Sequence, residues 1–395
     1  MHRNESNWLL FWTFLKIGST AFGGFMALIS VVQDYLVNRK KLLTDAEILD
    51  GISLATILPG PVAVNVVAYA GYRINGVIGA VVCATAVILP SFLLILLLSY
   101  VYFTWGEIPG VSNIFKGFIP AVAAIIIAAT INMGKKTLKG ISAYLVALCA
   151  LGVLTVVGGF FSTIAIIVAA GLAGVLLFKK SSGAERNAAS AKRAGGKRAF
   201  PVSVLAFLIL PLASLALPYL KIGSIVAVKL FITFAGMSVL LFGGGFVFIP
   251  MIQEIVVDTY GWVTNKEFID AIALGQITPG PILISATFIG YKMAGVLGAT
   301  AATIGIFLPP AALMLFCAHF LEKLKQSETI NAALSGIRCG VIGMIAAAAI
   351  VVLQSAEQNW ISLSIFVVAL LSLLKFKIEV AWIIPAAGLA GYLLY

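Results

Sequence analysis

Charged residues are scarce in this chain of 395 residues. They make up 10% of the sequence, and histidine occurs only twice. A soluble enzyme, a disordered tail or a nucleic-acid-binding domain needs a more polar composition, so these three classes are excluded. The four cysteines stand singly in apolar stretches and lack the paired spacing of a disulfide framework or a zinc site. We interpret them as small buried apolar residues.

Motifs that carry chemistry are also missing. The sequence contains no metal-ligand spacing, no nucleophile elbow and no phosphate-binding loop. We therefore expect no enzymatic activity, no metal and no cofactor. The net charge of +11 does not indicate a nucleic-acid partner, because the basic residues lie mostly in short loops between apolar runs.

Long apolar runs dominate the chain, in which 61% of the residues are hydrophobic and the mean hydropathy is +1.10. A membrane-spanning helix needs about 20 mostly apolar residues. We therefore predict an all-α polytopic membrane protein of about 13 spans, embedded in the lipid bilayer of the cell (inner) membrane. The candidate runs are 8–32, 52–72, 76–104, 113–132, 140–158, 160–178, 202–220, 224–252, 272–291, 294–320, 330–353, 359–374 and 378–395.

The distribution of basic residues predicts the orientation. With the N-terminus in the cytoplasm, 17 Lys and Arg residues fall in cytoplasmic segments, 5 in external segments and 4 within spans. Cytoplasmic loops of membrane proteins carry this excess, so we place the C-terminus outside. Arg39-Lys40-Lys41 falls outside on this count, against the trend.

The two halves of the chain repeat each other. The matches include Phe22-Gly23-Gly24 with Phe242-Gly243-Gly244, Thr44-x-x-Glu47-x-x-Asp50 with Thr264-x-x-Glu267-x-x-Asp270, Pro59-Gly60-Pro61 with Pro279-Gly280-Pro281, Gly71-Tyr72-Arg73 with Gly290-Tyr291-Lys292, and Leu89-Pro90 with Leu308-Pro309. We expect a first repeat over 1–178, a basic cytoplasmic linker over 179–201, a connecting span over 202–220 and a second repeat over 221–395. The single connecting span reverses the second repeat, and inverted repeats are typical of secondary transporters with a substrate site near mid-membrane.

Two spans of each repeat are predicted to be broken inside the membrane. The Thr-x-x-Glu segments fit capping boxes, which predict helix starts at Thr44 and Thr264. The alternative role of their acids is to carry a coupling proton. The helix after Thr44 reaches Pro59-Gly60-Pro61 after roughly 21 Å, which is too short for about 30 Å of hydrocarbon. The first span reaches Gly23-Gly24 over a similar length.

Broken helices persist in lipid only where they line a cavity or are buried in protein. A helix N-terminus offers free N–H groups and partial positive charge, which suit an anion. We therefore predict that the four breaks surround one oxyanion; the alternative is that the glycines permit close packing and the prolines only kink the helices. The predicted substrate-binding residues are Phe22, Gly23, Gly24, Pro59, Gly60, Pro61, Asn65, Gly243, Gly244, Gly245, Pro279, Gly280, Pro281, Ser285 and Arg338.

Basic residues inside spans are further candidates. Arg338 lies deep in the run 330–353, where a charge has an anion-binding or gating role or binds a structural partner. Lys116 and Lys229 lie near span ends, where long side chains extend to the interface.

The motifs quoted above resemble those of the chromate ion transporter family, in its two-domain form. The resemblance is carried by the Phe-Gly-Gly, Thr-x-x-Glu-x-x-Asp, Pro-Gly-Pro, Gly-Tyr-Arg and Leu-Pro segments, each echoed in the second half. It covers nearly the whole chain apart from the linker and the span 202–220. It implies export of chromate from the cytoplasm across the bacterial inner membrane and chromate resistance, with sulfate or related oxyanions handled by some members.

Our leading hypothesis is a secondary transporter of a divalent tetrahedral oxyanion, chromate or sulfate, that works by alternating access at the inverted-repeat site. Moving two negative charges across about 100 mV, inside negative, is worth roughly 4.6 kcal/mol, which favours export. The alternatives are a transporter of another anion or of a cation, and a passive anion channel. The expected partners are a small inorganic oxyanion and the bilayer, and a homodimer is left open.

Overall fold

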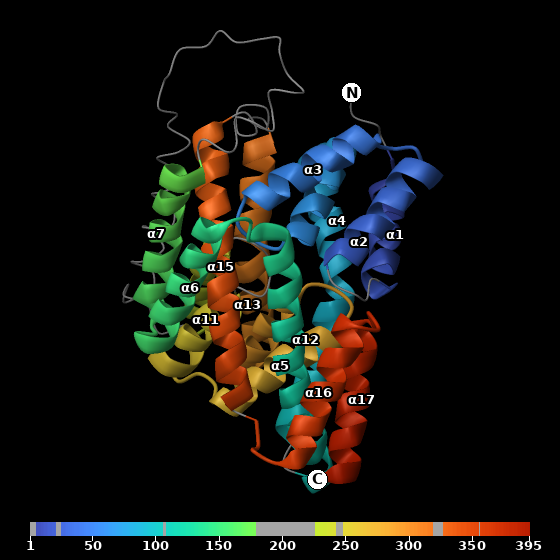
Figure 1. Cartoon of the computed structure of the whole chain (residues 1–395). Helices are drawn as coiled ribbons and strands as arrows, with labels where there is room; N and C mark the ends of the chain where they lie inside the picture. The colour runs from blue at the N-terminus through green and yellow to red at the C-terminus, as the bar shows by residue number, and fades with distance from the viewer. Residues whose placement is uncertain are drawn as a thin grey trace.

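Helices account for all regular structure in the described part of the chain, as the computed structural model shows (Figure 1). The described residues are 5–20, 25–105, 108–178, 226–241, 248–318, 327–354 and 356–395. Helices satisfy their own backbone hydrogen bonds, which a lipid environment requires. The linker 179–201 and the connecting span 202–220 lie outside the described residues.

The helices of the first half follow the apolar runs of the sequence. They are α1 (Asn7–Thr20), α2 (Phe25–Gln33) with a π-helical turn (Asp34–Arg39), α3 (Asp45–Ile57), α4 (Val62–Trp105), α5 (Pro109–Thr137), α6 (Ile141–Val156) and α7 (Phe160–Phe178).

The second half has a matching series. Its elements are α10 (Val226–Ser238), α11 (Phe248–Gln253) with a π-helical turn (Glu254–Thr259), α12 (Asn265–Ile277), a 3-10 turn (Ile282–Ile284), α13 (Ser285–Ala318), α15 (Glu328–Gln354), α16 (Trp360–Leu374) and α17 (Val380–Leu394).

Five helical stretches among the described residues are long and apolar enough to cross a membrane: Val62–Trp105, Ser112–Thr137, Phe161–Phe178, Ile282–Ala318 and Glu328–Gln354. Four shorter apolar helices, α6, α10, α16 and α17, accompany them. The all-α polytopic membrane fold is therefore confirmed. The count of about 13 spans and the inverted repeat stay predictions.

The chain reverses at Pro59-Gly60-Pro61, so that α3 and the start of α4 lie side by side. Glu47 and Arg73 form an ion pair of 2.7 Å, although 26 residues of straight helix would separate them by roughly 39 Å. Gly60 has a φ of +105°, a conformation that favours glycine and permits the reversal. The sequence predicted a break here; the structure adds that the two pieces form a hairpin that returns to the end where it started.

The second half folds in the same way at Pro279-Gly280-Pro281. Glu267 and Lys292, the repeat equivalents of Glu47 and Arg73, form an ion pair of 2.5 Å between α12 and α13. Gly280 again has a positive φ, of +130°. The runs 52–72 and 272–291, which we predicted to be interrupted spans, are thus parts of two helical hairpins whose tips are the Pro-Gly-Pro segments.

The two long helices each contain a second sharp turn. α4 consists of helical segments 62–74 and 77–105 joined at Asn75 and Gly76, and Gly76 has a φ of +65°. A side chain added at Gly71 would collide with the backbone of Gly79, so the segments cross in close contact. α13 turns in the same way at Ala294 and Gly295, between segments 285–293 and 296–318.

The first two helices of each half also lie beside each other. The Thr13 hydroxyl of α1 is 3.0 Å from the Tyr35 hydroxyl beyond α2. In the second half, the Lys229 ammonium of α10 lies 4.1 Å from the centre of the Tyr260 ring. The segments between these helices, residues 21–24 and 242–247, lie outside the described residues.

The open ends of the two hairpins, away from the Pro-Gly-Pro tips, lie at opposite ends of the α4 segment 77–105. At one end, the Asn75 amide donates to the Glu5 carbonyl oxygen at 2.5 Å. At the other end, the Phe103 ring stacks on Tyr291 with the ring centres 6.1 Å apart. Asn75 and Phe103 are separated by 28 residues, roughly 40 Å of helix. Figure 1 likewise shows α3 at the end of the molecule near the N-terminus, and α16 and α17 at the other end.

The halves are joined by helix packing across their interface. α13 packs on α4, and α15 lies against α5, α6 and α7. Small residues allow close approach here, because a side chain added at Gly336 would collide with the backbone of α7. The buried core is continuous between the two halves.

Candidate functional site

The two hairpin tips contact the long helix of the opposite half. A Cβ added at Gly60 would lie 2.6 Å from Pro310 Cγ of α13 and closer still to its Cβ. A Cβ added at Gly280 would lie 2.5 Å from the Ser91 hydroxyl oxygen of α4. Gly60 and Gly280 are repeat equivalents, and so are Ser91 and Pro310. The predicted Pro-Gly-Pro segments are therefore brought to the interface between the halves by reciprocal contacts.

The helix segments that receive the tips contain prolines. Pro90 lies inside α4, and Pro309 and Pro310 lie inside α13. A proline within a helix removes one backbone hydrogen bond and bends the axis, which makes room for a neighbouring chain segment. The Ser91 hydroxyl also donates a hydrogen bond to the Pro279 carbonyl oxygen, which ties the second tip to α4.

The first tip also reaches the region of the second Phe-Gly-Gly segment. The Gly60 N–H donates to the carbonyl oxygen of Leu241 at 2.7 Å, and Leu241 directly precedes Phe242. The predicted site residues Gly243, Gly244 and Gly245 lie outside the described residues. So do Phe22, Gly23 and Gly24.

Asn65 and Ser285 lie one turn beyond the tips and are completely buried. The Asn65 amide nitrogen donates to the Pro59 carbonyl oxygen at 3.2 Å, and the Ser285 hydroxyl donates to the Ile282 carbonyl oxygen at 2.9 Å. Both donors therefore stabilise their own hairpin tips. The Asn65 side-chain oxygen is buried without a hydrogen-bond partner.

Helix starts follow the tips, as the sequence predicted. In α4 the first intrahelical hydrogen bond runs from the Asn65 N–H to the Pro61 carbonyl oxygen at 2.9 Å. The amides of residues 62–64 precede it and have no acceptor within the helix. In the second half a 3-10 bond from Ile284 N–H to the Pro281 carbonyl oxygen, 3.0 Å, tightens the same turn. The two tips thus differ in local helix type.

Arg338 lies beside the first tip. Its Nη2 atom on α15 donates to the Thr56 carbonyl oxygen at 3.1 Å, and Thr56 is in the last turn of α3. A cation at a helix C-terminus is favourable because the last carbonyl groups carry partial negative charge. The structure therefore gives Arg338 a backbone partner within a few residues of Pro59.

The predicted capping boxes are present at both hairpin openings. Thr44 accepts from the Glu47 N–H while Glu47 accepts from the Thr44 N–H, and Thr264 and Glu267 repeat the arrangement. Burial acts to raise the pKa of Glu47, but hydrogen bonds from Arg73 and Thr44 outweigh it, so the pKa is lowered. The pKa of Glu267 is lowered in the same way, by Lys292 and Thr264 against the effect of burial.

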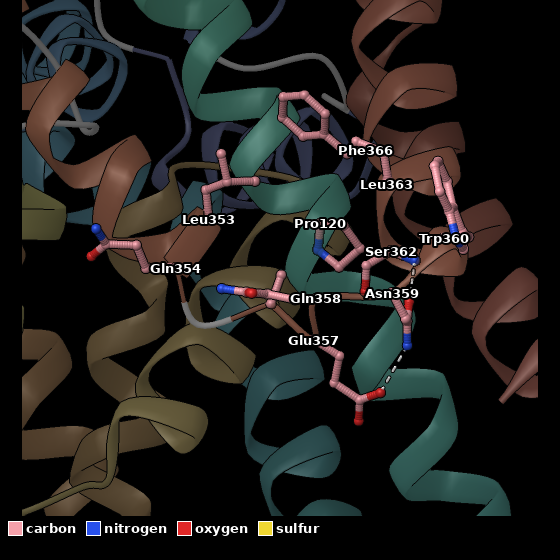
Figure 2. Close-up of a pocket in the computed structure, with 11 residues that line it drawn as sticks. Pro120, Leu353, Gln354, Glu357, Gln358, Asn359, Trp360, Ser362, Leu363 and Phe366 are labelled. Carbon is pink, nitrogen blue, oxygen red and sulfur yellow. Dashed lines mark hydrogen bonds between the residues drawn. The ribbon is translucent and has the colours of Figure 1, made fainter.

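Two cavities of the described residues contain no residue of the Pro-Gly-Pro segments. One, of about 650 Å³, opens at the start of α16, where Asn359 and Ser362 line it together with apolar groups such as Trp360 (Figure 2). Another, of about 470 Å³, lies between α4 and α13 and is lined mainly by aliphatic and aromatic side chains. The second cavity adjoins the first tip, because Val64 in the first turn after Pro61 lines it together with Leu89 and Leu308, which precede Pro90 and Pro309.

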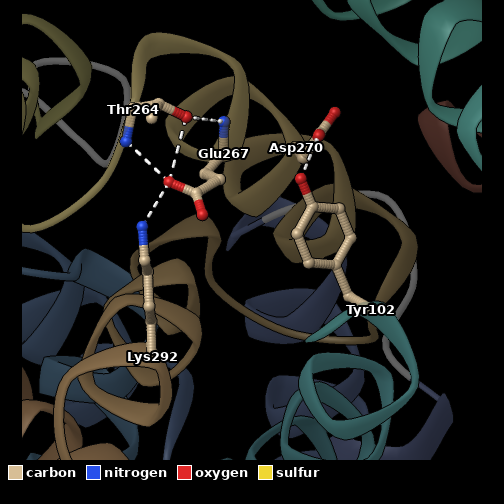
Figure 3. Close-up of polar contacts among 5 residues, drawn as sticks. All are labelled: Tyr102, Thr264, Glu267, Asp270 and Lys292. Carbon is tan, nitrogen blue, oxygen red and sulfur yellow. Dashed lines mark hydrogen bonds and ion pairs between the residues drawn. The ribbon is translucent and has the colours of Figure 1, made fainter. Parts of the chain in front are cut away.

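One polar pair was missed by sequence reasoning. Asp270 of α12 is completely buried and accepts a hydrogen bond from the Tyr102 hydroxyl of α4 at 2.7 Å (Figure 3). Its repeat equivalent Asp50 is only half-buried. The Thr-x-x-Glu-x-x-Asp repeat was the available signal, but the pattern alone does not say which of the two acids the opposite half covers.

Known proteins resemble this chain over nearly its whole length. The family model described as chromate transporter matches residues 8–175 and 228–392. A chromate transport protein of Cupriavidus metallidurans is 31% identical over 97% of this chain and 92% of its own length. A chromate transport protein of Pseudomonas aeruginosa is 31% identical over 98% of this chain and 92% of its own. An uncharacterized transporter of Bacillus subtilis is 30% identical over 42% of this chain and 96% of its own length. No solved structure matches.

Proposed function

Because this chain belongs to the chromate transporter family, a family of membrane transporters and not of enzymes, we propose that it carries a divalent tetrahedral oxyanion across the membrane. Chromate is the first candidate, since two full-length relatives are named for its transport. Sulfate is the second, because it is a tetrahedral dianion as well. The observation that carries the proposal is the pair of reciprocal tip contacts, Gly60 with Pro310 and Gly280 with Ser91.

The inverted repeat is part of the proposal. The open end of the first hairpin lies where the α4 segment 77–105 begins, and that of the second lies near Phe103 at its other end, which is the relation expected of halves that enter the membrane from opposite faces. The hairpin fold also supports a cytoplasmic N-terminus. Because α1 and α2 lie side by side, Arg39-Lys40-Lys41 returns to the end of the molecule where α1 begins, and the charge pattern obeys the positive-inside rule there.

The substrate site is proposed at the two tips. Free amides at the start of α4, the corresponding turn at Ile282–Ile284 and the guanidinium of Arg338 supply hydrogen-bond donors and positive charge without a buried carboxylate beside them. The residues that we propose to contact the oxyanion are Phe22, Gly23, Gly24, Pro59, Gly60, Pro61, Asn65, Gly243, Gly244, Gly245, Pro279, Gly280, Pro281, Ser285 and Arg338.

Alternating access follows from the same contacts. When the first tip separates from Pro310, the site opens toward the face from which that hairpin enters, and when the second tip separates from Ser91, it opens toward the other face. The two motions are related by the repeat, so the opening of one face is matched by closure at the other. Export is the proposed direction, since the potential itself contributes roughly 4.6 kcal/mol per dianion at about 100 mV.

Flux measurements in proteoliposomes test this proposal. Labelled chromate inside vesicles should leave faster when a potential, inside negative, is imposed, and unlabelled chromate outside should accelerate exchange because a carrier cycles between two faces. Flux that neither saturates nor exchanges would identify a passive anion channel. Flux that does not change with the potential would refute electrogenic export. Exchange of only a cation or another anion, without chromate, would refute chromate as the substrate.

A mutational test addresses the site directly. Replacing Pro59-Gly60-Pro61 by three alanines, and separately Pro279-Gly280-Pro281, should abolish chromate tolerance in cells that express the protein. Tolerance that survives both replacements at normal expression would show that the site lies elsewhere.

Assembly as a homodimer is also proposed, and light scattering of the detergent-purified chain measures it.

A further inference from the structure

Asp270 is a buried acid that the tip mechanism does not use. It lies in the second turn of α12 and has no accessible surface. One carboxylate oxygen, Oδ2, accepts from the Tyr102 hydroxyl at 2.7 Å, and the other, Oδ1, is buried without a hydrogen-bond partner. A buried carboxylate that lacks a partner for one oxygen is unfavourable in its charged form, and a proton bound at that oxygen removes the charge.

No basic group of the described residues forms an ion pair with Asp270. Lys266 and Glu267 precede it in its own helix, and Glu267 is bound to Lys292 of α13. The Lys116 ammonium of α5 pairs with Glu357 at 3.1 Å. α11 and the turn at residues 282–284 carry no titratable side chain. The remaining titratable side chains at this end of the packed helices are the hydroxyls of Tyr100 and Tyr102 on α4, Tyr291 on α13, and Tyr392 and Tyr395 at the end of α17.

The surroundings also favour a proton over a metal cation. The Tyr102 ring packs edge to face on Phe115 and Phe288, at centre distances of 4.8 Å and 5.0 Å. Such an apolar wall supplies no oxygen ligands, whereas sodium and other hard cations need several. Within the described part of the chain, no cluster of three His, Cys, Asp or Glu residues is present.

The Asp270–Tyr102 hydrogen bond joins the second hairpin to α4 of the first half. Asp270 belongs to the hairpin whose tip is Pro279-Gly280-Pro281, and Tyr102 belongs to α4, which also holds Ser91 against that tip. A hydrogen bond to a carboxylate is roughly twice as strong as one between neutral groups, so a proton on Asp270 weakens the attachment of the hairpin to α4.

We propose that Asp270 is a proton-binding site, with Tyr102 as its positioning residue, that couples proton movement to oxyanion transport by releasing the second hairpin from α4. The proton forms an O–H bond with Oδ1 after entering from water at one face, and it returns to water at the other face, with no electron transferred. On the proposed orientation this end of α12 faces outward, so protons enter as the dianion leaves. The inference rests on the proposed function, because it assigns the coupling ion of that transport.

Two assays on the full chain in proteoliposomes separate coupling from transport. The first is exchange of labelled chromate at equal concentration and pH on both sides. The second is chromate accumulation driven by an imposed pH difference, with the potential clamped by potassium and valinomycin. In Asp270→Asn, exchange should stay within about threefold of the natural protein while pH-driven accumulation falls at least tenfold. Asp50→Asn, at the half-buried repeat equivalent, is the matched control and should keep both activities.

The outcomes are distinguishable. pH-driven accumulation that persists in Asp270→Asn, or that is lost equally in Asp50→Asn, overturns the inference and leaves the proposed function standing. Exchange without any pH-driven accumulation in the natural protein overturns it as well, as does accumulation driven only by sodium. Absence of both activities in the natural protein refutes the proposed function instead.

A second variant guards against misfolding of Asp270→Asn. Tyr102→Phe keeps the acid and the ring and removes only the hydroxyl. Because that hydroxyl stabilises the charged carboxylate, its loss should move the midpoint of the pH profile of accumulation by at least half a unit to higher pH, while exchange persists. An unchanged midpoint would show that the pair is only structural.

Discussion

Replacement of Gly60 by alanine tests whether the close contact between the first tip and Pro310 is needed for transport. The added Cβ meets Pro310 and also occupies a φ of +105°. Backbone strain of this kind costs about 1–3 kcal/mol. Overpacking against the proline ring adds about 1–3 kcal/mol, which by itself shifts an equilibrium about 5- to 150-fold.

Gly140 supplies the matched control for that strain. It has a φ of +83°, but a Cβ added there meets nothing within 4 Å. Gly140→Ala therefore introduces comparable strain without a collision. We expect chromate exchange in proteoliposomes to fall at least tenfold more in Gly60→Ala than in Gly140→Ala, with both proteins purified as monodisperse material.

A second replacement at Pro310 makes the test specific. Pro310→Gly removes the ring atoms that the new Cβ meets, so it should restore part of the exchange lost in Gly60→Ala. If Gly60→Ala transports chromate as well as Gly140→Ala does, or if Pro310→Gly brings no recovery, the packed tip is not the closed state of a moving gate and the reasoning fails.

Two further predictions concern the surroundings of the tips. Arg338→Gln removes a charged donor to the Thr56 carbonyl, worth about 1.5–3 kcal/mol, and should raise the chromate concentration for half-maximal transport at least fivefold; an unchanged value would exclude Arg338 from the site. The lowered pKa of Glu47 means that its pairing with Arg73 stabilises the fold fully above the ordinary value of 4.5 and loses this effect as the pH falls through the lowered value. The thermal midpoint in detergent should therefore fall on acidification below about pH 4.5, and less so in Glu47→Gln; identical acid limbs for the two proteins would contradict the assignment.

Local features of the hairpins follow from sequence alone. The capping boxes at Thr44 and Thr264 form as predicted, because a hydroxyl three residues before a Glu satisfies the first amides of a helix. The breaks at the Pro-Gly-Pro segments also lie where they were predicted, since the two prolines lack backbone donors and the glycine between them readily adopts a positive φ. These features depend on neighbouring residues, so a single sequence contains them.

Features that depend on distant parts of the chain could not be predicted. The helix pieces on either side of Gly60 have the same apolar pattern whether they continue in line or fold back, and the contact between Glu47 and Arg73 decides between the two. Likewise, Asp50 and Asp270 occupy equivalent motif positions, and the burial of Asp270 results from its contact with Tyr102, 168 residues away in the sequence. Tertiary contacts therefore decide that the helix pieces around Gly60 form a hairpin, and that Asp270 rather than Asp50 is the fully buried acid.

The exchange of contacts between the halves has a consequence for how such a protein is assembled. Each half supplies a tip that packs on the long helix of the other half, and a long helix that receives the tip of the other half. Made as two separate chains, the halves are therefore expected to associate in the bilayer through both contacts. Because the two halves are covalently linked, each molecule contains one copy of each half, whereas separate chains would have to meet by diffusion in the bilayer.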